Sequence, residues 1–124
     1  MKLSVDEFGK LVDAAMAEIP PPLQRYLENV IVEVEAMPSG EDIAEVGIDD
    51  PTELLGLYHG TPLTERGVEF AGALPDRITI YQRNIEQICR SRREIVEEIR
   101  TTVLHEIGHH FGLGEDDLFD VGYE

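Results

Sequence analysis

The stretch from His105 to Gly112, HEIGHHFG, contains three of the chain's four histidines within six residues. His105 and His109 are four residues apart, so on a helix they project from one face with Cβ atoms about 5–6 Å apart. Two neutral imidazoles placed in this way can bind one Zn²⁺ at about 2.0–2.1 Å each. Glu106 follows about 100° further around the helix, where a carboxylate borders the metal and can take a proton from a metal-activated water. The spacing therefore predicts hydrolytic zinc chemistry.

The other residues of this helix test the alternative that the histidines belong to an ordinary helix face. With His105 at 0° on a helix of 3.6 residues per turn, His109 falls near 40°. The apolar side chains lie between about 120° and 260°, and they are Val96, Ile99, Val103, Leu104, Ile107 and Phe111. The histidine pair thus lies outside the predicted core face.

Gly112 stands where this helix is expected to end, because glycine reaches the left-handed conformation that reverses the chain at little cost. A catalytic zinc site has three protein ligands and one open position. The segment after the turn offers the carboxylates of Glu115, Asp116 and Asp117 as oxygen donors. The same acids also suit the start of a last short helix, and both roles are compatible if Glu115 ligates.

The stretch HEIGHHFGLGE resembles the HExxHxxGxxH/D motif of the metzincin-type zincins. More closely, the chain from about residue 5 to residue 123 resembles the minimal, bacterial zincin-like (MMP-like) metallopeptidase domain family. Three further blocks, LGLY from Leu55, PLTER from Pro62 and LPDRITIY from Leu74, also look like sequence blocks of that family. The resemblance implies a zincin fold and a zinc-dependent peptide hydrolase whose substrate is a peptide or protein.

Carried over to this chain, the resemblance implies a Zn²⁺ ion on His105, His109 and Glu115, with Glu106 as general base. The family usually has Asp at the third-ligand position, whereas this chain has Glu115 followed by Asp116. Asp116 is therefore the alternative third ligand.

The chain also departs from the larger metzincins, which place a methionine turn below the metal. All three methionines precede the motif, and twelve residues follow Gly112. We therefore expect a cleft that is open on one side. The alternative function is a non-catalytic, zinc-containing peptide-binding or regulatory protein with a zincin fold.

Apolar periodicity and capping patterns predict the elements that position the motif. We expect an amphipathic helix from a capping box at Ser4 to the prolines at 20–22, and a long helix from Ser91 to about Phe111. Between them we expect a helical turn at 23–28, strands at 30–35, 54–58 and 77–81, a solvent-facing loop with at most a helical turn at 37–52, and a short helix at 84–89. Residues 1–124 should form a single α+β zincin-like domain, with a short mixed sheet packed against the N-terminal helix and the HExxH helix.

The composition of the chain argues against some classes of binding partner. The chain has 26 acidic and 10 basic residues and a net charge of −16, which disfavours nucleic acid and anionic lipid surfaces. It has no apolar stretch near the ~20 residues of a membrane span, and its single cysteine, Cys89, fits a reducing compartment. We therefore expect a cytoplasmic protein without nucleic-acid or membrane partners, which prefers basic or neutral peptides to acidic ones.

Several residues near the predicted site have two interpretations. Thr102 and Glu98 share the histidine face and either orient the imidazoles or are ordinary exposed polar residues. Tyr58, Tyr81 and Tyr123 each either donate a hydrogen bond to a tetrahedral intermediate or pack in the core. His59, isolated in a glycine-containing loop, is expected to be exposed.

Overall fold

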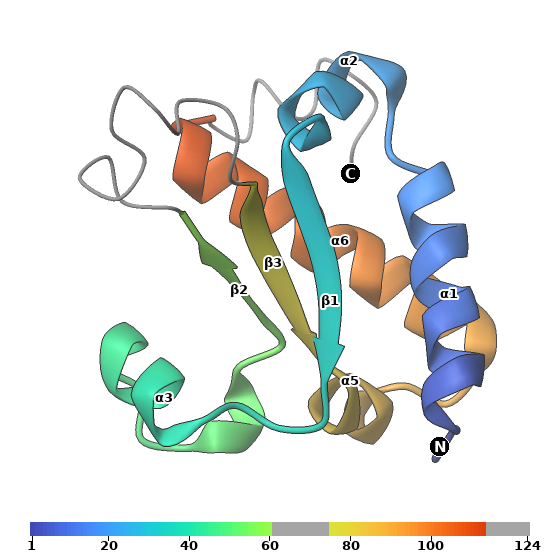
Figure 1. The fold of residues 1–124 in the computed structure, drawn as a ribbon. Coiled ribbons are helices and arrows are strands. Elements are labelled where there is room, and N and C mark those ends of the chain that lie inside the picture. Colours follow the sequence, from blue (N-terminus) through green and yellow to red (C-terminus); the bar gives the residue numbers. More distant parts are fainter. Residues whose placement is uncertain (61–74, 114–124) are drawn as a thin grey trace.

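The computed structural model describes residues 1–60 and 75–113 (Figure 1). Within these ranges three strands form one mixed sheet in the order β1-β3-β2. β1 (Val30–Glu35) is parallel to the central strand β3 (Asp76–Tyr81), and β2 (Gly56–His59) is antiparallel to it. Five α-helices accompany the sheet in the described part of the chain. This is the small α+β architecture that the sequence predicts.

The helix α6 (Arg92–Phe111) crosses one face of the sheet and packs against α1 (Val5–Ala17) (Figure 1). Its apolar side chains at three- and four-residue spacing form the centre of the core. Fully buried side chains from α6, β3 and α1 meet there, among them Ile95, Ile99, Val103, Ile107, Ile78, Ile80 and Phe8. The face of α6 opposite this core is therefore left to the motif histidines.

Both long helices begin at the predicted serine caps. The Ser4 hydroxyl accepts a hydrogen bond from the backbone N of Glu7, whose carboxylate accepts one from the backbone N of Ser4, both at 3.1 Å. The Ser91 hydroxyl caps α6 by accepting a hydrogen bond from the backbone N of Glu94, whose carboxylate accepts one from the backbone N of Arg90 and not of Ser91. The helix ends at Gly112, which has a φ of +69°, so the predicted start and end of the motif helix are confirmed.

The region 37–52 is more ordered than predicted. It contains α3 (Gly40–Val46) and the 3₁₀-helix η2 (Pro51–Glu53). The Ser39 hydroxyl accepts from the backbone N of Asp42, and Gly47 closes the helix with a φ of +72°. Because both ends of α3 are capped, seven residues rich in acids form a helix in place of a loop. η2 also occupies the residues just before Leu54, so β2 begins at Gly56 and not at Leu54.

The remaining short elements agree with the sequence to within about two residues. The predicted turn at 23–28 consists of α2 (Pro21–Gln24) and the 3₁₀-helix η1 (Arg25–Leu27), and the predicted helix at 84–89 is α5 (Gln82–Ile88). Cys89 is buried after α5, and burial raises the pKa of its thiol to about 11. This thiol stays protonated at neutral pH and packs as a small apolar residue.

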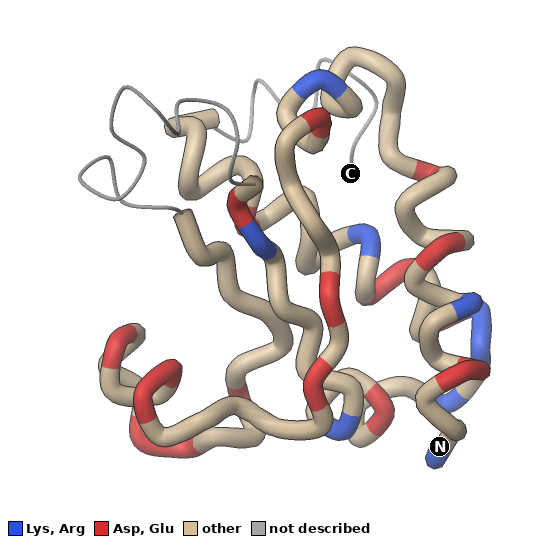
Figure 2. Tube along the Cα trace, viewed as in Figure 1, with Lys and Arg blue, Asp and Glu red and all other residues tan. Residues whose placement is uncertain are grey.

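Charge is distributed unevenly along the chain (Figure 2). Residues 26–60 contain nine acidic residues and no Lys or Arg. Five arginines from Arg77 onward pair with glutamates on β1, on α1 and its C-cap, on α5 and on α6. Among the described residues, no helix is both long and apolar enough to cross a membrane.

Glu86 on α5 is a buried acid that holds the N-terminal segment in place. One carboxylate oxygen accepts from the backbone N of Leu3 at 3.0 Å and from Gln82 at 2.9 Å, and the other accepts from Arg83 at 2.7 Å. Burial alone would raise the pKa of Glu86, but these hydrogen bonds outweigh it and the pKa is lowered. The charged carboxylate therefore stabilises the folded chain.

We expect Glu86→Gln to lower the free energy of unfolding by about 2 kcal/mol at pH 7, because hydrogen bonds to a buried charge are lost. The native pKa lies below the unfolded value of about 4.3, so this stabilisation is complete above that pH and is lost as the pH falls toward the native pKa. Urea denaturation at several pH values measures it, with the exposed Glu97→Gln as control. A gap between wild type and variant that is the same at pH 7 and pH 3 would contradict the assignment.

Candidate metal centre

His105 and His109 lie side by side on the exposed face of α6, as their spacing predicts. Their ring centroids are 4.1 Å apart. The nearest ligand atoms of His105, Glu106 and His109 all lie within 4.8 Å of one another. Two nitrogens on one tetrahedral zinc ion are about 3.3 Å apart, so a small rotation of the rings brings them into range. The two imidazoles make no hydrogen bond or ion pair within the described part of the chain, and this donor set fits Zn²⁺.

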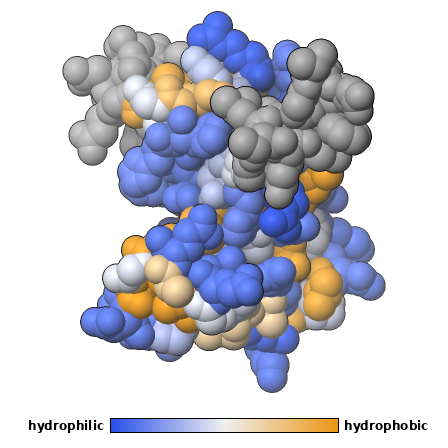
Figure 3. Space-filling view, turned by 60° about the vertical axis from the view of Figure 1, so that its left-hand side comes forward, coloured by the Kyte–Doolittle hydropathy of each residue, from blue (hydrophilic) through white to orange (hydrophobic). Residues whose placement is uncertain are grey.

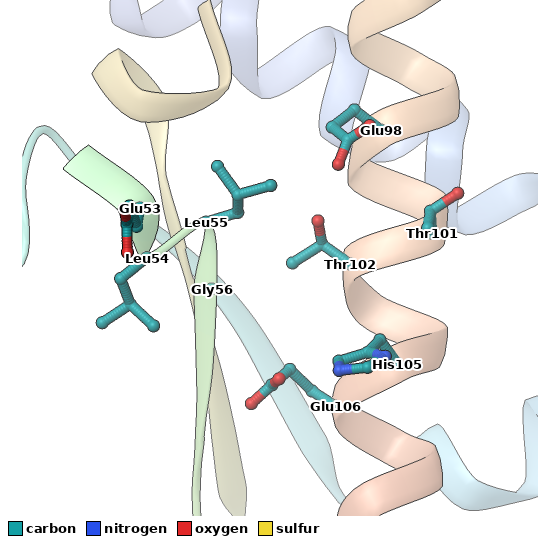
Figure 4. Close-up of a pocket in the computed structure, with 9 residues that line it drawn as sticks. All are labelled: Glu53, Leu54, Leu55, Gly56, Glu98, Thr101, Thr102, His105 and Glu106. Atoms are coloured by element: carbon teal, nitrogen blue, oxygen red, sulfur yellow. The ribbon is translucent and has the colours of Figure 1, made fainter. Parts of the chain in front are cut away.

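Glu106 reaches from α6 to the outer edge of β2 (Figure 4). Its Oε1 accepts a hydrogen bond from the backbone N of Tyr58 at 3.0 Å. In an antiparallel ladder the backbone groups of alternate residues face the partner strand. The backbone O of Leu55 accepts a hydrogen bond from the backbone N of Tyr81 in β3. The backbone groups of residue 55 and of every second residue after it therefore face β3, whereas the N–H of Tyr58 points away from it. The sheet edge thus fixes the carboxylate beside the histidine pair.

β2 lies close against α6 at Gly56. A Cβ atom at this position would lie 2.6 Å from Cγ2 of Thr102 and 3.1 Å from the backbone O of Thr79. Thr102 is buried and packs against the strand. This packing explains a threonine at position 102, and no role in orienting the imidazoles is needed. Glycine at position 56 therefore sets the spacing between the strand and the motif helix.

We expect Gly56→Ala to lower the free energy of unfolding by about 2 kcal/mol, because the added methyl overpacks the contact between helix and strand. Thr102→Ser removes the clashing methyl, so the penalty of Gly56→Ala should be about 1 kcal/mol smaller in that background. Chemical denaturation of the four chains measures this coupling. Gly9→Ala, where nothing lies within 4 Å, is the control and should not destabilise. Strict additivity of the two substitutions would refute the contact.

His110 lies apart from the histidine pair, at the end of α6. Its ring stacks on Tyr58 with centroids 3.9 Å apart, and its Nε2 is 3.8 Å from a carboxylate oxygen of Asp76. The same oxygen accepts a hydrogen bond from the Tyr58 hydroxyl at 2.7 Å. These contacts hold the end of α6 against β2 and β3. Tyr81 is fully buried and its hydroxyl donates to Asp42, so it packs in the core.

His59 is partly buried, which corrects the expectation that it is exposed. It lies at the end of β2, and its nearest ligand atom is within 4.8 Å of those of Asp42 and Glu45. The expectation is wrong because residues 40–46 form the helix α3 and not a loop, and this helix brings its acids to His59. This second group offers one imidazole where the motif offers two.

The predicted third ligand, Glu115, its alternative, Asp116, and the candidate hydrogen-bond donor Tyr123 lie outside the described residues. The last described feature on that side is the turn at Gly112, where the backbone N of Leu113 donates to Gly108 O at 2.8 Å. The third ligand stays a prediction.

Comparison with known proteins identifies the family. The family model described as zincin-like metallopeptidase matches residues 27–123. The chain belongs to the zincin-like metallopeptidase family. This confirms the resemblance found in the sequence, and it implies a metal-dependent, peptidase-like function for the fold that presents His105, Glu106 and His109.

This zincin-like chain is also similar to a solved structure over most of its length. A conserved hypothetical protein from Thermus thermophilus is 27% identical, with a TM-score of 0.55, over 88% of this chain and 94% of that chain. No curated protein matches the chain. The structural neighbour supports the fold, but its description names no reaction.

Proposed function

We propose that this zincin-like protein is a zinc-dependent peptide hydrolase. The observation that carries the proposal is a carboxylate, Glu106, held by a sheet edge beside two exposed imidazoles of the same helix face. His105 and His109 bind the metal, with Glu115 or Asp116 as the third ligand. A purely structural zinc site would have no use for Glu106 and would more often have four protein ligands.

Glu106 is the general base in this proposal. When bound, zinc polarises the peptide carbonyl and lowers the pKa of the attacking water. The N–H of Tyr58 occupies Oε1 of Glu106, so we assign the proton transfer to Oε2. This oxygen takes the proton from water and later delivers it to the leaving amine, which a carboxylate in hydrogen-bond reach of both can do.

β2 is the strand that we propose to align the substrate. It is an edge strand of the described sheet and lies beside α6. The backbone N–H and C=O of Gly56 face outward, by the same alternation that turns the N–H of Tyr58 away from β3. An extended peptide can pair with such an edge through main-chain hydrogen bonds, which would place its backbone next to Glu106.

The proposal is tested with the chain carrying one equivalent of zinc and a mixed peptide library in large excess. Mass spectrometry should find new peptide termini, lost on chelation and restored by added zinc. A chain that binds library peptides but produces no new termini would instead be the non-catalytic peptide-binding protein. In that alternative, the peptide would pair with the same edge of β2, in the cleft that we expect to be open on one side.

A further inference from the structure

A cavity of about 330 Å³ opens between β2 and α6, next to the candidate metal centre (Figure 4). Residues 53–56 line its strand side, and Glu98, Thr102, His105 and Glu106 are among those on its helix side. Its volume is at the small end of the range of ligand pockets, about 300–1,000 Å³, and suits one side chain. Because it shares His105 and Glu106 with the candidate centre, its occupant would lie beside the reacting bond.

The two walls of the cavity each carry a carboxylate. Glu53 belongs to η2 on the strand side, and Glu98 points from α6 toward the gap (Figure 4). Among the described residues, neither side chain has a hydrogen bond or an ion pair. Within the part of the chain that the structure describes, no Lys or Arg lines the cavity. By contrast, Glu97, the neighbour of Glu98, pairs with Arg93 at 3.1 Å.

The rest of the strand-side wall is apolar. Leu54 and Leu55 are partly buried and line this wall (Figure 4). Long basic side chains place an aliphatic stem against apolar surface while the charged head meets polar groups. The face brought forward in Figure 3 is mostly hydrophilic, with apolar residues in scattered patches.

We propose that the cavity binds the side chain of a lysine or arginine of the peptide, with Glu53 and Glu98 pairing with its charged head. The proposal rests on the proposed peptidase function and adds its substrate class: peptides with a basic residue close to the cleaved bond. The nine acids and absent basic residues of the segment 26–60 add a long-range attraction for such peptides.

The experiment separates binding from cleavage. Peptides that differ at one position, as Lys, Arg, Leu or Glu, are titrated into the zinc-loaded Glu106→Gln variant and followed by fluorescence anisotropy. We expect the Lys and Arg peptides to bind at least about tenfold more tightly than the Leu peptide, and the Glu peptide to bind most weakly. The preference should shrink as the salt concentration rises.

Matched variants then assign the preference to the cavity. In the same background, Glu98→Gln should weaken binding of the Lys peptide about fivefold and leave the Leu peptide unchanged, and adding Glu53→Gln should remove the preference. Glu97→Gln makes the same charge change one residue away, on the paired side chain, and should have little effect. Circular dichroism checks that each variant is folded.

The outcomes distinguish this proposal from the proposed function. Equal binding of the Lys, Leu and Glu peptides, no binding of the Lys peptide, or an equal loss in Glu97→Gln and Glu98→Gln would each overturn the basic-side-chain pocket, whatever the wild type cleaves. A Lys preference lost in Glu98→Gln, with no cleavage by the zinc-loaded wild type, would leave the pocket in place and overturn the hydrolase.

Discussion

Replacing both His105 and His109 with Ala is expected to reduce bound zinc from about one equivalent per chain to less than about a tenth. The reason is that two of three protein ligands are lost, and oxygen donors alone hold Zn²⁺ weakly. Metal analysis of protein purified without chelator measures the loss. At zinc concentrations 100-fold above the dissociation constant, zinc should stabilise the wild type by about 2.7 kcal/mol and the variant hardly at all.

His59→Ala is the matched control for this prediction, because His59 is the imidazole of the second ligand-type group with Asp42 and Glu45. This variant should keep its zinc. If the double variant kept one equivalent of zinc and His59→Ala lost it, the metal would belong to α3 and β2, and the motif would not be the metal centre.

Replacing Glu106 with Gln is expected to lower kcat for peptide hydrolysis by about 10³-fold, within the range of about 10²–10⁴ for loss of a general base. Gln keeps the size of the side chain and an oxygen that can accept from the N–H of Tyr58, but it cannot take a proton from water. Zinc content and peptide affinity should therefore change little. Steady-state kinetics at equal zinc occupancy measures the effect.

Glu97→Gln is the control on the same helix, and its kcat should equal that of the wild type. A Glu106→Gln variant with wild-type kcat would remove Glu106 as the base. A variant that loses zinc as well as activity would indicate a ligand or structural role for the carboxylate instead.

The part of the site that was predictable from sequence is local. Four residues of helix bring His105 and His109 together whatever the rest of the chain does, and Ser91 and Gly112 mark the ends of that helix. The same local logic placed the long helices and the strands. The sequence also contains a local signal for α3, because Ser39 caps its start through the backbone N of Asp42 and Gly47 closes its end.

The rest of the site depends on contacts between distant parts of the chain. The bond from Tyr58 to Glu106 spans 48 residues, and the packing of Gly56 on Thr102 joins the same two elements. Neither hydrophobic periodicity nor motif spacing in the sequence predicts these contacts between β2 and α6, since they form only when β2 pairs at the edge of the sheet. The cavity with Glu53 and Glu98 also forms only when β2 packs beside α6. The sequence therefore shows the negative net charge of the chain but not that these two carboxylates line one cavity.

The measurement that tests the central claim most directly is the rate of hydrolysis of one lysine-containing peptide as zinc is returned to the metal-free chain. We expect the rate to rise in proportion to zinc up to one equivalent and then to level off, with no comparable rise for Glu106→Gln at the same occupancy. A wild-type chain that takes up one equivalent of zinc and still leaves the peptide intact would contradict it.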